Sequence, residues 1–309
     1  MMMTFEGESV NDYTHIIPEK RSLADLDNST RISIIKRDIW IPTKKLDQLF
    51  TTIDFMIGSE GRLVVPSMLV WGPGGSGKSA IIERLKHIYT TRDKNIKSIS
   101  AGMNLDSSQL VDLICNSFGI SSGAGRQSLD RTTRVLNTIR AENIAALLMD
   151  ELNDSGLRTL AQQKNSMSLM KFLSGPPCYL SIICFGDLTS AEVLMRDNQI
   201  YRRYVHWPLT PWKNDQDFCD FLATYESHLP LKLPSDISCS AGRRRILKQS
   251  LGVMDNVVKI IKCLAYEAVL NGTERMDVEL VDNDICYLCM RYGEALRRSP
   301  EPKQAKLKR

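Results

Sequence analysis

A glycine-rich loop between an apolar run and a helical pattern carries the strongest chemical signal in this sequence. The loop fits the pattern G-x-x-x-x-G-K-[ST] and reads Gly72-Pro73-Gly74-Gly75-Ser76-Gly77-Lys78-Ser79. Glycines let backbone N–H groups turn inward around a polyphosphate, and the positive end of the following helix, from Ala80 onward, attracts the same anion. In this pattern Lys78 reaches the β- and γ-phosphates, and the hydroxyl of Ser79 ligates Mg²⁺. The sequence therefore predicts a binding site for ATP and Mg²⁺.

Two adjacent acids supply the second part of that chemistry. The apolar run 144–149 ends in Asp150 and Glu151. We expect Asp150 to hold Mg²⁺ through its water shell, as in other P-loop proteins. A carboxylate near the γ-phosphate can orient or deprotonate the attacking water, and Glu151 is placed for that role.

Three further residues are weaker candidates for catalysis. Asp187 follows the apolar run 179–185 and is either a sensor of the γ-phosphate or a helix cap. Arg202 and Arg203 precede the next apolar run. They are either an arginine finger, which neutralises the charge that grows in the transition state on a neighbouring subunit's nucleotide, or a solvated surface pair.

Apolar periodicity places these side chains in an α/β fold. Up to about residue 212, helical patterns alternate with short apolar runs, which predicts a buried parallel sheet with strands at 67–71, 96–100, 144–149, 179–185 and 204–209. After residue 212 only helical patterns follow. We expect an N-terminal arm (1–36), a P-loop core with a three-layer αβα architecture (37–213), a small α-helical lid (214–296) and a basic tail (297–309).

Composition narrows the class of protein without identifying its partner. The 309 residues are 43% hydrophobic and 25% charged, which excludes a disordered chain and a collagen-like repeat. The net charge of +4 is too small to indicate nucleic acid by itself, but residues 291–309 are strongly basic. The N-terminus has no apolar signal segment, no run is long enough to span a membrane, and the eight cysteines show no disulfide spacing. We therefore expect a cytoplasmic protein without a membrane partner.

At this point the sequence resembles the AAA+ ATPases, and within them the TniB/TnsC-type transposition regulators. The resemblance covers about residues 37–290. It rests on the two phosphate motifs and on flanking stretches, namely Arg37–Pro42, Leu169–Leu173 and Tyr201–Trp212. It implies an ATPase that assembles with itself into a ring or helical filament on double-stranded DNA. It also implies that this assembly connects a TniQ-like target-selection protein to a DDE transposase.

The resemblance also directs attention to possible DNA contacts. In such rings the loops after the second strand and before the third tend to face the pore, and we assign Lys94, Lys97 and Arg126 to those loops. Each is equally an ordinary surface residue. Contacts to phosphates would suffice there, because no base-reading motif is visible.

Two positions depart from the family pattern. Asp187 stands where similar proteins commonly carry a threonine, and the lid offers only Lys259 where many AAA+ proteins place an arginine. Three alternatives remain open: a replication-initiator or helicase-loader ATPase, a P-loop kinase or NTPase with no nucleic-acid role, and a module that holds ATP without turnover. The intact Lys78, Asp150 and Glu151 argue against the last.

Overall fold

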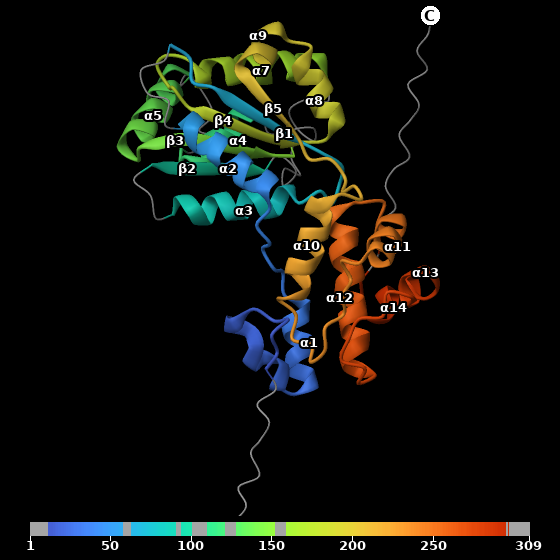
Figure 1. Cartoon of the computed structure of the whole chain (residues 1–309). Coiled ribbons are helices and arrows are strands. Elements are labelled where there is room, and N and C mark those ends of the chain that lie inside the picture. The colour runs from blue at the N-terminus through green and yellow to red at the C-terminus, as the bar shows by residue number, and fades with distance from the viewer. Residues whose placement is uncertain are drawn as a thin grey trace, which may run out of the picture. The chain divides into compact units, whose positions relative to one another are not determined.

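The computed structural model describes residues 12–57, 63–90, 94–100, 110–120, 128–151, 159–294 and 296. The chain forms two compact units (Figure 1). One unit spans Lys44–Thr210, and the other combines Met1–Thr43 with Pro211–Arg309. We call them the P-loop unit and the helical unit.

A five-stranded sheet forms the centre of the P-loop unit. Its strands run parallel in the order β2-β3-β4-β1-β5. Their bounds are β1 Ser67–Trp71, β2 Asn95–Ser100, β3 Ile144–Asp150, β4 Ser181–Gly186 and β5 Tyr204–Pro208. Every residue of β4 is buried, which explains its continuous apolar run, because a parallel strand is covered on both faces. The five predicted strands are therefore confirmed, with bounds that shift by a few residues.

Helices cover both faces of this sheet (Figure 1), with α3 on one side and α7 on the other. The helices of the P-loop unit are α2 Lys44–Ile57, α3 Lys78–Tyr89, α4 Leu110–Ser117, α5 Ser128–Ala141, α7 Leu160–Ser174, α8 Leu188–Met195 and α9 Asn198–Arg203. One apolar core joins the inner strands to α4, α5, α7 and α8; Leu147, Ile182 and Met170 are fully buried in it. This is the expected three-layer α/β fold.

The helical unit has a second core. Its elements are η1 Pro18–Asp25, α1 Asn28–Lys36, α10 Gln216–Glu226, α11 Ser240–Ser250, α12 Met254–Leu270, α13 Leu280–Asn283 and α14 Ile285–Arg291. The long helix α12 contacts α1, α11 and α14. Ile35 from α1 is fully buried among apolar residues of α10 and α12, so part of the expected N-terminal arm is integral to this unit.

Two details of the helical unit differ from the sequence-based expectation. Residues 28–36 form a helix that apolar spacing does not predict, because a charged residue, Arg31, shares its buried face with Ile35. The lid, expected to be helical through residue 296, ends in two short helices, α13 and α14, which meet at Asp284. None of the described helices is long and apolar enough to cross a membrane.

Candidate nucleotide-binding site

The ends of three neighbouring strands bring the predicted site together. Strand β4 lies between β1 and β3, with Trp71 beside Gly186 and Met149 beside Cys184. The chain continues from these ends into Gly72, Asp187 and Asp150. Because the strands are parallel, all three continuations emerge at the carboxyl edge of the sheet, where open α/β sheets bind ligands.

The loop after β1 is held close to its neighbours at its first residue. The N–H of Gly72 donates to the carbonyl of Gly186 at 3.2 Å. A Cβ atom on Gly72 would lie 2.6 Å from the carbonyl oxygen of Leu209, so only glycine fits there. Gly75 and Gly77 adopt φ of 78° and 93°, which side-chain-bearing residues rarely tolerate. The glycines thus have the conformational roles that the motif requires.

The start of α3 presents backbone donors. The helix begins at Lys78 with Gly77 as its N-cap, and no side chain caps this end. The first N–H groups of a helix have no partner inside it, so those of Lys78, Ser79 and Ala80 are available to an anion. Ser79 and Ala80 are exposed, as a ligand-binding turn requires.

Lys78 lies folded over the loop. Its Nζ atom donates to the carbonyl oxygens of Gly72 and Pro73, each at 2.9 Å. Burial lowers the pKa of Lys78, while the negative charges of Asp150, Asp187 and Glu151 oppose that shift. The structure therefore places three carboxylates within electrostatic reach of this ammonium group.

The two acids at the end of β3 differ in environment. Burial raises the pKa of Asp150, although a hydrogen bond from the N–H of Glu151 and the charge of Lys78 favour its ionised form. That N–H lies 3.0 Å from Oδ1 of Asp150. Glu151 is exposed and has φ of 52°, a backbone conformation that is uncommon for non-glycine residues and often found at functional sites.

Asp187 is both a helix cap and a neighbour of the site. Its Oδ1 accepts from the N–H of Ser190 at 2.8 Å and from the Ser190 hydroxyl at 2.7 Å, so it caps α8. Its charge also acts on Lys78. The two interpretations of Asp187 are therefore compatible.

Arg202 and Arg203 end α9, directly before β5. Arg202 is exposed, and it forms no ion pair or hydrogen bond with any residue in the described part of the chain. Arg203 is half-buried, and its charge acts on Tyr204. Of the pair, Arg202 is the more available to a neighbouring molecule.

The DNA candidates lie elsewhere than expected. Lys94 directly precedes β2 and Lys97 lies within it, so neither is on a loop between β2 and β3; that assignment is wrong. Lys97 forms an ion pair with Glu142 at 2.5 Å. Strand β2 begins one residue before the predicted start, and Lys94 therefore lies at the amino edge of the sheet. Arg126 falls outside the described residues.

Gly186 is a site residue that sequence reasoning passed over. Its carbonyl accepts from Gly72, and a Cβ atom on Gly186 would lie 2.9 Å from Cβ of Ser190. The signal was present, because a glycine directly after an apolar strand and before a capping aspartate marks close backbone packing.

Comparison with known proteins agrees with this geometry. The family model described as bacterial TniB protein matches residues 31–214. None of the curated proteins matches the chain in sequence.

Among solved structures, the fold is similar to that of the Orc1 protein of Aeropyrum pernix in complex with DNA. The identity is 14% and the TM-score 0.58, over 82% of this chain and 69% of that one. It is also similar to Cdc6p from Pyrobaculum aerophilum, with 15% identity and a TM-score of 0.57 over 86% of each chain. A third similar structure is a Walker-type ATPase of Pyrococcus abyssi, with 14% identity and a TM-score of 0.53 over 84% of this chain and 75% of that one. At these identities the likeness concerns the fold alone, whereas the family match covers more than half of the chain. The chain belongs to the TniB family of AAA+ ATPases.

Proposed function

We propose that this ATPase regulates DNA transposition in the cytoplasm. It oligomerises on duplex DNA when it binds ATP, and it links a TniQ-like target-selection protein to a DDE transposase. One observation carries the proposal: a TniB-family chain brings Lys78, Asp150 and Glu151 together at the carboxyl edge of its sheet.

The residues present fit Mg-ATP. Magnesium in phosphoryl-transfer sites is held by one or two protein oxygens together with substrate phosphates, and Asp150 and Ser79 are ligands of that kind. Bound Mg²⁺ neutralises charge on the phosphates during transfer. The uncapped start of α3 and the half-buried ammonium of Lys78 supply the positive potential that phosphates need.

Each candidate then has a defined task. Gly72–Ala80 wrap the phosphates through backbone N–H groups, and Lys78 exchanges its two carbonyl partners for phosphate oxygens. Glu151, exposed at the strand end, holds the attacking water and accepts its proton. Asp187 senses the γ-phosphate through its charge on Lys78.

Self-assembly completes the site in this proposal. Arg202 lies exposed at the end of α9 and reaches the nucleotide of the next subunit. An arginine at that point stabilises charge that develops in the transition state. Hydrolysis then weakens the subunit contact and permits disassembly.

In this proposal DNA binding depends on many weak contacts, because each subunit contributes the same few cations. Contacts to phosphates need only cations and backbone N–H groups, and every subunit of an assembly presents the same set to one duplex. Arg126 and the basic residues 297–309 are the preferred contacts. Lys94 and Lys97 are secondary, because Lys97 is engaged by Glu142.

A replication-initiator or helicase-loader role is the second candidate, favoured by the likeness to Orc1 and Cdc6. The family match supports the transposition role over it and over a P-loop kinase without a nucleic-acid role, because the match is to TniB. Partner tests separate the two: ATP-dependent co-purification with a DDE transposase and a TniQ-like protein supports transposition, whereas capture of a replicative helicase supports loading.

Electron microscopy tests assembly. The protein is imaged with a non-hydrolysable ATP analogue, with and without linear duplex DNA. Rings or filaments that require both nucleotide and DNA support the proposal, and a monodisperse monomer under every condition contradicts it.

A further inference from the structure

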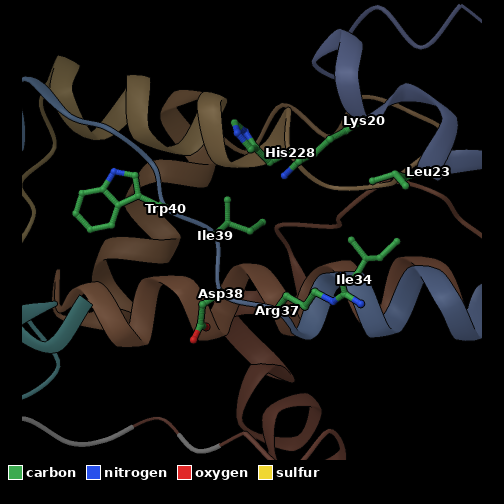
Figure 2. Close-up of a pocket in the computed structure, with 8 residues that line it drawn as sticks. All are labelled: Lys20, Leu23, Ile34, Arg37, Asp38, Ile39, Trp40 and His228. Carbon is green, nitrogen blue, oxygen red and sulfur yellow. The ribbon is translucent and has the colours of Figure 1, made fainter. Parts of the chain in front are cut away.

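The helical unit contains a pocket of about 420 Å³ that the proposed ATPase cycle does not use. It is lined by residues of η1, of α1 and the segment that follows α1, and by His228, two residues beyond the end of α10 (Figure 2). The residues that line it are Lys20, Leu23, Ile34, Arg37, Asp38, Ile39, Trp40 and His228.

Half of the lining is apolar. Leu23, Ile34, Ile39 and Trp40 contribute large side chains, and Ile39 lies near the middle of the group in Figure 2. All four are half-buried, so each keeps apolar surface that a ligand can cover. A pocket with this lining favours a large aliphatic or aromatic group.

The charged side chains of the lining leave the pocket with an excess of positive charge. In the described part of the chain, Lys20 and Arg37 form no ion pair with a carboxylate. The one acid of the lining, Asp38, is already engaged, because its Oδ1 accepts from Nζ of Lys262 at 2.9 Å. Burial lowers the pKa of Lys20, which means that the fold partly desolvates this ammonium group without supplying a counter-charge.

His228 adds a polar group beside Lys20. Its Nδ1 lies 2.8 Å from the carbonyl oxygen of Thr224, an acceptor, so Nδ1 carries a proton. Figure 2 shows Lys20 and His228 on the same side of the pocket. An anion seated against Lys20 is therefore also close to the imidazole of His228.

We propose that this pocket binds a short acidic peptide segment of a partner protein. A large apolar side chain of the peptide covers Ile39 and Trp40, and a neighbouring carboxylate pairs with Lys20 and Arg37. Charge complementarity favours this occupant, because the pocket holds two cations without counter-charge and an engaged acid. A DNA backbone would satisfy the cations but has no apolar group for the apolar half. The proposal concerns a partner contact and does not depend on the assignment of the ATP site.

A display library of random hexapeptides, screened against the full-length protein, tests the proposal. The enriched peptides should combine Asp or Glu with Trp, Phe, Leu or Ile. Fluorescence anisotropy then measures their affinity for a double charge-reversal variant, Lys20→Glu with Arg37→Glu, which should bind at least about tenfold more weakly. Trp40→Ala should also weaken binding. The matched control, Arg244→Glu with Lys248→Glu, changes two exposed cations of α11 and should bind like the wild type.

Three results overturn the proposal. The first is a screen with no enrichment, or enriched peptides that bind the double variant as tightly as the wild type while circular dichroism shows both folded. The second is loss of duplex-DNA affinity in the double variant with peptide affinity unchanged, which assigns the cations to DNA. The third is peptide binding only after deletion of residues 1–11, which contain Phe5, Glu6 and Glu8, because this chain's own segment would then be the occupant.

Discussion

Arg31 and Glu274 form a bidentate ion pair within the helical unit, although they are far apart in the sequence. Nη1 of Arg31 lies 2.6 Å from Oε2 of Glu274, and Nη2 lies 2.7 Å from Oε1. The guanidinium is 1% exposed and also donates to the carbonyl of Pro230 and to Asn28. This contact fixes α1 to the segment that follows α12.

Removing the arginine should destabilise the helical unit. Arg31→Ala leaves Glu274 partly buried without its counter-charge, and breaking a buried pair costs about 3 kcal/mol or more. Urea unfolding followed by circular dichroism measures the change. The control Arg275→Ala alters an exposed neighbour and should shift the free energy of unfolding by less than about 0.5 kcal/mol. Equal effects of the two changes would show that the buried pair contributes nothing.

The same pair predicts a pH dependence. Burial alone would raise the pKa of Glu274, but the hydrogen bond and charge of Arg31 outweigh it and hold that pKa below its ordinary value of 4.5. The unfolded chain therefore binds a proton more readily, so the pair's stabilisation is present above pH 4.5 and is lost as pH falls through the lower folded pKa. Urea unfolding at a series of acidic pH values should show the wild type losing more stability than Glu274→Gln. Parallel curves for the two proteins would contradict this.

Local pattern was sufficient to predict most elements of the P-loop unit. Apolar runs such as residues 144–149 form strands that are covered on both faces of a parallel sheet, so each is visible in the sequence as a short continuous apolar run between polar residues. Helix α1 could not be found in this way, because Arg31 occupies a buried position that the pattern assigns to an apolar residue. Its one local signal was Asp27, whose side chain caps the helix by accepting from the N–H of Thr30.

Asp187 can be tested for its two roles separately. Asn also caps helices, so Asp187→Asn should keep stability within about 0.5 kcal/mol while removing the charge that acts on Lys78. We expect ATP hydrolysis to slow by about tenfold or more. Asp187→Ala should lose the cap as well, at a cost of about 1 kcal/mol. Wild-type hydrolysis by Asp187→Asn would reduce Asp187 to a helix cap.

Arg202 is expected to act on the neighbouring subunit. Arg202→Ala should lower ATP turnover by about a thousandfold, and Glu151→Gln should bind ATP but hydrolyse it slowly. Mixed together on DNA, the two variants should recover part of the activity, because some interfaces then pair an intact Glu151 with an intact Arg202. The control Arg196→Ala changes an exposed arginine at the end of α8 and should keep full activity. A mixture that stays inactive would contradict action between subunits.

Local residue spacing predicts the parts of the site that lie within one turn, but it does not predict contacts that depend on the order of the strands in the sheet. The phosphate motifs predict roles for Lys78 and Asp150 because each strand-to-loop turn is local. The close approach of Gly72 to Gly186 depends on strand order, which no local pattern states. The placement of Lys94 and Lys97 on loops after β2 failed although the strand expected at 96–100 starts only one residue after the observed start of β2, because Lys97 lies inside that strand and Lys94 precedes it.

The most direct test of the account is ATP-dependent retention on DNA. Fluorescence anisotropy of a labelled duplex is followed with ATP and Mg²⁺ for the wild type, Lys78→Ala and Glu151→Gln. The account predicts no stable complex with Lys78→Ala, transient binding by the wild type, and a long-lived complex with Glu151→Gln, which binds ATP but hydrolyses it slowly. Equal DNA binding by all three proteins, with or without ATP, would contradict it.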